Sequence, residues 1–173
     1  MKLRIHGQRL MHNMSMNDII FMQAALAQAR LAWESGEIPV GAVVVKEGEI
    51  IGAGFNQSIT QHDPTAHAEV VALRNAAHNI GNYRLTGCDL YVTLEPCLMC
   101  SGAMMHARLS RVIFGARDPK TGVCGSVMNV FDHKELNHHT EVVPDILANE
   151  CSALLKDFFV QRRLEKVSIE RSK

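Results

Sequence analysis

The sequence lacks the features that mark a membrane protein, a secreted protein or a strongly basic nucleic-acid binder. Its 173 residues carry no net formal charge, so overall charge does not indicate a nucleic-acid partner, although local charge still can. No apolar run approaches the roughly 20 residues that cross a bilayer, so we expect no membrane contact. The first 16 residues are basic but hold no continuous apolar segment, unlike a secretory signal. We therefore expect a cytoplasmic protein.

The chain also lacks internal repeats, low-complexity segments and any recognisable linker between domains. Its length fits one domain, which buries roughly 70% of its unfolded surface and needs no covalent staples. In the cytoplasm its five cysteines are expected to be thiols or metal ligands rather than disulfides. Among them, Cys88, Cys124 and Cys151 are expected to pack as ordinary residues.

The first expected helix runs over 17–34, with Asn17 or Asp18 as its N-cap. Apolar residues recur within it at helical spacing, which predicts one buried face. The residues of this predicted face are Ile20, Ala24, Ala27 and Leu31.

Strand and helix patterns then alternate along the rest of the chain. Two apolar runs around a Gly-containing turn predict an antiparallel hairpin, and Asp63-Pro64 is typical of a helix start. This order predicts an α/β fold, a three-layer α/β/α sandwich with a five-stranded mixed sheet. The expected strands are 40–45, 50–54, 89–94, 111–116 and 139–144, and the expected helices are 66–77, 97–109 and 145–166.

Two cysteines open the expected third helix, in the segment LYVTLEPCLMC. Cys97 and Cys100 are three residues apart, so their sulfurs lie on one helix face within reach of one ion. The first turn of a helix stabilises thiolates, which are the form that binds metal. Taken alone, the pair is equally compatible with a redox pair or with two packed thiols.

His67 and Glu69, in PTAHAEVV, open the expected second helix. With Cys97 and Cys100, His67 completes a three-ligand set with an open fourth position, which is the catalytic type of zinc site. Glu69 would be an unligated carboxylate that moves protons beside the metal. Residues two apart point to opposite sides of a regular helix, so both side chains reach one site only if the helix entry is irregular. His133, His138 and His139 lie in a polar loop and are not expected to form a second metal cluster.

These motifs resemble those of the zinc-dependent deaminases of nucleobases, whose signature is H-x-E followed by P-C-x-x-C. The segments HDPTAHAE, NYRLTG, LYVTLEPCLMCSGAMMHAR, VIFGARDPKTGVCGS and ECSALLKDFF follow one another and resemble the bacterial tRNA-specific adenosine deaminases. The resemblance implies a cytidine-deaminase-like fold, one zinc ion per subunit and a homodimer. It divides the chain into an N-terminal extension (1–16), expected to be disordered, a zinc-dependent deaminase domain (17–166) and a C-terminal tail (167–173).

The resemblance also implies a reaction, the hydrolytic conversion of adenosine to inosine at the wobble position of an arginine tRNA anticodon. A zinc hydroxide would attack C6 of the flipped-out adenine, with Glu69 as proton shuttle. Asn56 is a candidate to hydrogen-bond the base or its sugar, although a turn role fits its local sequence equally well.

Several other residues are candidates for contact with RNA. Arg117 and Lys120 would contact phosphate, and Asp118 would accept a bond from a ribose hydroxyl or simply close a turn before Pro119. From residue 156 onward the chain holds six basic and three acidic residues, a net charge of +3. There Phe158, Phe159 and Arg162 would supply stacking and phosphate contacts. Adjacent helical residues point about 100° apart and rarely both bury in one face, so one of the two phenylalanines is expected to lie in the core.

Two other functions compete with this one. A deaminase of free bases or nucleotides shares the zinc motif, and a pocket closed by the chain's own C-terminus would favour it. A non-catalytic zinc module would need a closed site with four ligands, whereas the sequence offers three ligands and a free carboxylate.

Overall fold

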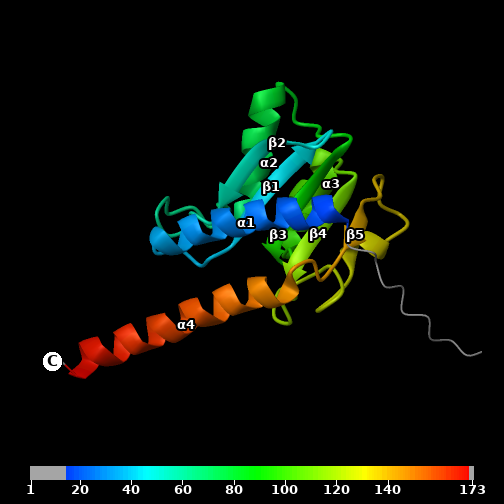
Figure 1. The fold of residues 1–173 in the computed structure, drawn as a ribbon. Helices are drawn as coiled ribbons and strands as arrows, with labels where there is room; N and C mark the ends of the chain where they lie inside the picture. Colours follow the sequence, from blue (N-terminus) through cyan, green and yellow to red (C-terminus); the bar gives the residue numbers. More distant parts are fainter. Residues whose placement is uncertain (1–14, 172–173) are drawn as a thin grey trace, which may run out of the picture.

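A five-stranded mixed sheet forms the centre of the protein (Figure 1). The computed structural model describes the backbone of residues 15–171 and the side chains of residues 15–168. The sheet order is β2-β1-β3-β4-β5, with β1 antiparallel to β2 and β3, and with β3, β4 and β5 parallel. The strands are β1 (Gly41–Lys46), β2 (Glu49–Phe55), β3 (Cys88–Leu94), β4 (Arg111–Ala116) and β5 (Glu141–Val143).

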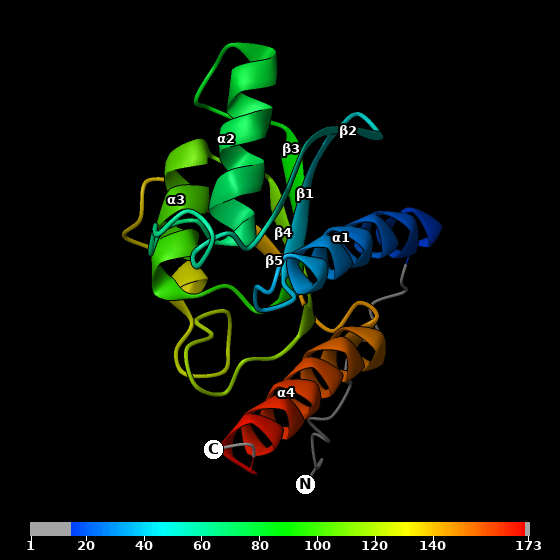
Figure 2. The same cartoon turned by 90° about the vertical axis from the view of Figure 1, so that its left-hand side faces the viewer.

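Helices cover both faces of the sheet and confirm the three-layer architecture (Figure 2). One face carries the first and last helices, and the other carries the two helices between them. The helices are α1 (Met16–Glu34), α2 (Ala68–Ile80), α3 (Leu98–Ala107) and α4 (Ala148–Arg171), with a short 3-10 helix, η1 (Val130–Asp132).

The three middle strands, β1, β3 and β4, are buried on both faces. One core lies between the sheet and α2 with α3, and a second lies between the sheet and α1 with α4. Strands covered on both sides read as continuous apolar runs rather than alternating ones. This is why VGAVVV, DLYVTL and RVIFGA were readable as strands in the sequence.

Two glycines of β2 allow α2 to lie unusually close to the sheet. A Cβ added at Gly52 would lie 2.6 Å from the carbonyl oxygen of Ala72, and one at Gly54 would lie 2.5 Å from the amide nitrogen of Ala72. These distances are shorter than van der Waals contact, so any other residue would push the helix away. The glycines therefore fix the position of α2 and of the residues at its N-terminus.

The expected cap and face of α1 are both wrong. The N-cap is Ser15, whose hydroxyl accepts a hydrogen bond from the backbone N–H of Asp18 at 3.1 Å. Ile20 is 50% exposed and Leu31 is 42% exposed. The buried face instead holds Met22, Leu26 and three alanines, two of which lie where the backbone of α1 closely approaches Gly41 of β1.

The structure corrects two further helix boundaries. α2 begins at Ala68, two residues later than expected, because the Asp63 carboxylate accepts bonds from the backbone and hydroxyl of Thr65 and closes a turn before the helix. α4 begins at Ala148, three residues later than expected, because Asp145 and Leu147 have positive φ values of 69° and 51°.

α4 continues past residue 166 to Arg171 without interruption. Residues 1–14 of the expected N-terminal extension lie outside the described part of the chain, and the division into extension, domain and tail stays a prediction. Within residues 15–171, none of the helices combines the length and the apolar character needed to span a membrane.

A buried polar group links α1 to the sheet and explains the correction at Asp18. The Tyr91 hydroxyl donates to the Asp18 carboxylate at 2.8 Å, and Arg111 donates to the Tyr91 oxygen at 3.2 Å and to Asp89 at 2.6 Å. Burial, together with the bond to Asp18, raises the pKa of Tyr91. Asp18 is therefore placed by tertiary contacts and not by a capping role.

We expect Tyr91→Phe to destabilise the protein by about 1–2 kcal/mol, because Asp18 loses a hydrogen-bond donor that buried surroundings do not replace. For a chain of this size, the melting temperature should fall by about 2 to 8 °C in a thermal unfolding scan. Tyr83→Phe is the matched control, because Tyr83 is 67% exposed, and it should leave the melting temperature unchanged. Equal effects of the two substitutions would show that the Asp18 bond contributes nothing.

Candidate active site

The N-terminal ends of α2 and α3 meet beyond the carboxyl end of β3. His67 is the N-cap residue of α2, Cys97 is the N-cap residue of α3, and Cys100 lies in the first turn of α3. Neither N-cap side chain forms a capping hydrogen bond, and both face the junction. The sequence motifs H-x-E and P-C-x-x-C are brought together in this way.

The three candidate metal ligands converge on one point. The His67 Nδ1 atom lies 3.7 Å from the Cys97 sulfur and 3.6 Å from the Cys100 sulfur, and the ligand atoms all lie within 4.8 Å of one another. One imidazole and two thiolates form a donor set that suits zinc and leaves a fourth position open. In the described part of the chain no other group of His, Cys, Asp and Glu converges in this manner, the loop histidines included.

The environment favours a thiolate at this junction. A hydrogen bond from the Cys100 thiol, together with the contact to His67, lowers the pKa of Cys97 to about 4. The same hydrogen bond raises the pKa of Cys100, because the Cys100 thiol is the donor and keeps the proton. The hydrogen bond between His67 and Cys97 raises the pKa of His67. Ligands must be deprotonated to bind a metal, so a thiolate stable near neutral pH prepares the site for zinc.

Glu69 lies in the first turn of α2 and is only 4% exposed. His67 has extended backbone angles, with φ −74° and ψ 153°, so the rule for two residues inside a helix does not apply to this pair. Both side chains line the same pocket. Burial raises the pKa of the Glu69 carboxyl, which suits a group that takes up and releases a proton near neutral pH.

The pocket beside these residues has a volume of about 190 Å³. Its walls come from the segment before β1, the end of β3, the N-terminal ends of α2 and α3, and the loops after β2 and β4. α4 contributes none of its walls. The lining residues are Ile38, Val40, Asn56, His67, Glu69, Leu94, Glu95, Cys97, Asp118 and Thr121.

The structure brings Asn56 and Asp118 to this pocket, and each also has a local role. The Asn56 amide accepts from the backbone N–H of Ala68 at 2.9 Å and donates to the Ile38 carbonyl at 3.2 Å. Asp118 accepts from the backbone N–H of Lys120 at 2.9 Å and from the Thr121 hydroxyl at 2.6 Å. The local and pocket interpretations of these two residues are therefore compatible.

Arg117 and Lys120 lie next to the pocket without lining it. Arg117 forms a two-bond ion pair with Asp145, at 3.1 and 2.9 Å, which raises the pKa of the guanidinium. Its charge is therefore partly neutralised, whereas the Lys120 side chain is exposed at the pocket rim.

The candidate residues of α4 lie away from the pocket. Phe158 is 5% exposed and packs edge-on against Trp33, with ring centroids 5.4 Å apart, whereas Phe159 is 44% exposed. The expectation that one of the two phenylalanines is buried is confirmed. Arg162 lies over the Phe158 ring and 3.4 Å from Glu165.

Sequence reasoning did not single out five of the pocket residues, which are Ile38, Val40, Leu94, Glu95 and Thr121. Ile38 lies in a segment that carries no motif, and Thr121 lies in the segment VIFGARDPKTGVCGS, where only its neighbours were candidates. For Glu95, the one signal in the sequence that it lies at the pocket is its position directly before Pro96-Cys97.

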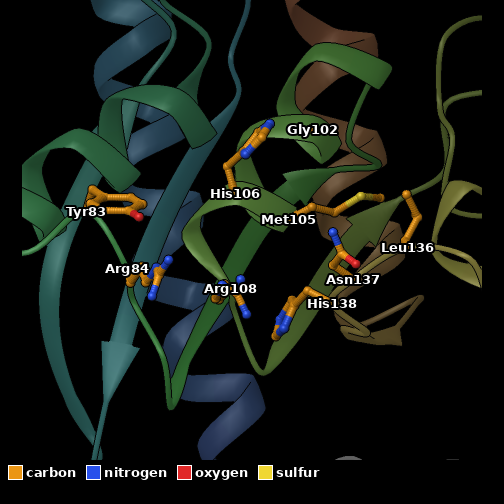
Figure 3. A pocket seen from close by; sticks show the side chains of 9 residues that line it. All are labelled: Tyr83, Arg84, Gly102, Met105, His106, Arg108, Leu136, Asn137 and His138. Atoms are coloured by element: carbon orange, nitrogen blue, oxygen red, sulfur yellow. The ribbon is translucent and has the colours of Figure 1, made fainter.

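A larger hollow, of about 290 Å³, lies at the other end of α3 (Figure 3). It is lined by side chains such as Arg84, Met105, Arg108 and His138 and contains no cysteine or carboxylate. It therefore lacks the groups that the chemistry at the junction requires.

Comparison with known proteins agrees with this geometry. Residues 15–116 match the family model of the cytidine and deoxycytidylate deaminase zinc-binding region. The tRNA-specific adenosine deaminase of Haemophilus influenzae is 56% identical over 146 residues, which cover 84% of each chain.

The chain belongs to the tRNA-specific adenosine deaminases. The Bacillus subtilis member of this family is 42% identical over 155 residues, covering 90% of this chain and 96% of the relative. A structure from studies of A-to-I editing by tRNA:A34 deaminases at the wobble position of transfer RNA superimposes with a TM-score of 0.76 at 41% identity. It covers 79% of this chain and 99% of the other.

We expect Cys97→Ala to weaken zinc binding by more than about 100-fold. Loss of a residue that only supports a ligand lowers metal affinity by about 10- to 100-fold, and loss of a direct ligand should cost more. Zinc retained after dialysis against a chelator of graded strength measures this. Cys88→Ala is the control, because Cys88 is buried at the start of β3 and should keep the metal. Zinc retained fully by Cys97→Ala would contradict the assigned ligand set.

Proposed function

We propose that this chain converts adenosine to inosine at the wobble position of tRNA, with an arginine tRNA anticodon as its substrate. The observation that carries the proposal is a three-ligand site with an open position and an unligated, buried Glu69 in one pocket, found within this family. The proposed substrate places the activity in the cytoplasm.

The proposed cofactor is one zinc ion per subunit, held by His67, Cys97 and Cys100. When bound, zinc lowers the pKa of a water molecule toward ~7 and so provides a nucleophile at neutral pH. Glu69 takes one proton of the attacking water and passes it to the adenine ring nitrogen. It then takes the remaining proton from the hydroxyl on C6 and delivers it to the amino group, which leaves as ammonia while the C6 carbonyl forms. Its burial supports this role because a raised pKa allows the carboxyl to hold and release a proton in one cycle.

An anticodon loop suits this pocket because its bases leave their stack at lower cost than those of a duplex. In the proposed complex, Asn56 and Asp118 contact the nucleotide, and Arg117 and Lys120 contact the neighbouring phosphates. Phe158, Phe159 and Arg162 extend the contact along α4, with the exposed Phe159 as the stacking surface.

A pocket open to a large substrate supports RNA over a free base. A deaminase of small molecules gains by closing its pocket with its own chain, and α4 instead leaves the body and lines no part of the pocket (Figure 1). A purely structural zinc module would require a fourth protein ligand, and the described residues provide only three.

The outer face of α3 supports the proposed homodimer. Leu98 is 60% exposed, Gly102 has open space around its Cα, and Met105 follows one turn later toward the hollow of Figure 3. These residues recur at helical spacing and form a stripe that is exposed at Leu98 and only partly covered at Gly102 and Met105 in a single chain. We propose that a second copy covers this stripe.

We expect Leu98→Asp to shift the protein from dimer to monomer in sedimentation velocity, because a buried carboxylate without a partner opposes association. Leu164→Asp is the control, because Leu164 is 67% exposed on α4, outside this face, and should leave the mass unchanged. A monomeric wild-type protein, or a dimer unaffected by Leu98→Asp, would remove α3 as the interface.

Glu69→Gln should lower kcat on an arginine anticodon stem-loop by about 10²- to 10⁴-fold while zinc content stays unchanged, because the amide cannot carry the proton. Inosine in the product RNA measures turnover, with free adenosine, cytidine, deoxycytidylate and guanine tested in parallel. Glu49→Gln, an exposed glutamate of β2, is the control. Turnover of a free base or nucleotide alone would overturn the RNA substrate, and full activity of Glu69→Gln would overturn the proton shuttle.

A further inference from the structure

The loop of residues 117–126, which follows β4, folds around one buried carboxylate. Glu95 is 2% exposed, and its side chain accepts hydrogen bonds from the backbone N–H groups of Asp118 at 3.0 Å, Cys124 at 2.9 Å and Ser126 at 3.0 Å. The Ser126 hydroxyl donates to the same carboxylate. Four donors from one loop therefore end on a single side chain.

The loop has no regular secondary structure that would hold it in the absence of Glu95. Gly122 lies so close that an added Cβ would be 2.4 Å from the carboxyl carbon of Glu95. Two further links lead to the same short segment: Val123 donates to the Pro96 carbonyl at 3.0 Å, and Gly122 pairs with Cys97. At its two ends the loop is also tied to other segments, by the Arg117–Asp145 ion pair and by the pairing of Cys124 with Asn129. The loop is thus held against the residues that connect β3 to the metal site.

This loop carries two residues of the pocket, Asp118 and Thr121, which are joined by a 2.6 Å hydrogen bond. We propose that Glu95 is a positioning residue for the deamination. It holds the loop against the pocket, and it acts on the bound nucleotide through the position of Asp118. This inference rests on the proposed function for its substrate and adds a residue to which no role in the reaction has been given.

The pattern of donors requires a carboxylate at this position. One oxygen accepts from Cys124 and Ser126, and the other accepts from Asp118 and the Ser126 hydroxyl. Glutamine has nearly the same shape but turns an NH₂ group toward one pair of donors, so bonds on one side are lost. Glu95→Gln therefore tests the bonds with little change in volume.

We expect Glu95→Gln to raise KM for the anticodon stem-loop by about 10- to 100-fold, the effect of losing hydrogen bonds to a charged group, with a smaller change in kcat. Zinc content should stay that of the wild type. Asp118→Ala should also raise KM, and the double variant should be no worse than the poorer single variant, because the two residues act through one path.

Glu37→Gln is the matched control for this cycle. Glu37 is also 2% exposed and holds a different loop, by accepting bonds from the backbone and hydroxyl of Thr60. Any effect of Glu37→Gln on KM should therefore add to the effect of Asp118→Ala, because the two residues act on different loops. Additive effects of Glu95→Gln and Asp118→Ala, or a loss of thermal stability with no change in KM, would overturn the proposal.

Hydrogen exchange gives a readout that does not depend on turnover. In Glu95→Gln the amides of Asp118, Cys124 and Ser126 should exchange at least about 10-fold faster, while those of β3 and β4 stay protected. Unchanged exchange in the loop would overturn the proposal even if activity falls. If Glu95→Gln does not fold, Ser126→Ala removes one donor alone and should raise KM by a smaller factor, again without adding to Asp118→Ala. A wild-type chain inactive on the stem-loop would overturn the proposed function, and the exchange data would still decide whether Glu95 holds the loop.

Discussion

The site depends on the meeting of two helix N-termini at one point. Each N-terminus carries partial positive charge, so two of them facing each other repel unless negative charge lies between them. The Cys97 thiolate supplies such charge, because hydrogen bonds from Cys100 and His67 lower its pKa to about 4. Gly52 and Gly54 let α2 lie close to the sheet, and the apolar face that α2 buries there opposes any movement of the two helices apart. Metal-binding chemistry and packing are therefore one constraint.

Two buried glutamates at this junction have opposite surroundings. Glu95 receives four hydrogen bonds from one loop, so its environment keeps the side chain in a single arrangement. At Glu69, burial is the largest influence on the carboxyl and raises its pKa. A saturated carboxylate suits a structural anchor, and a desolvated one suits proton transfer. Glu69 and Glu95 are 26 positions apart in the sequence and are of one residue type. They are suited to different purposes because Glu95 accepts four hydrogen bonds from a loop, whereas Glu69 is mainly desolvated.

The sequence predicted the sheet and the metal site well because both rest on local patterns. Strands buried on both faces give apolar runs, and His67, Cys97 and Cys100 stand at helix starts that Pro96 and the flanking loops mark. The prediction from the sequence failed for the buried face of α1. Alanines occupy much of that face, while the larger Ile20 and Leu31 face outward, so side-chain size did not indicate which residues are buried. Glu95 and Asp18 were also beyond reach, since their partners lie more than 20 residues away in the chain.

α4 leaves the body after Phe158, and its last turns extend away from the rest of the chain (Figure 1). The 14 residues from Phe158 to Arg171 span about 20 Å, so a tilt of about 10° at Phe158 moves the end of the helix by about 3 Å. A helix end that moves this far cannot keep a hydrogen-bond donor within the few tenths of an ångström that recognition of a base demands. The outer turns are therefore suited to long-range attraction of a charged partner, and the residues around the pocket are better placed for contacts that require an exact distance.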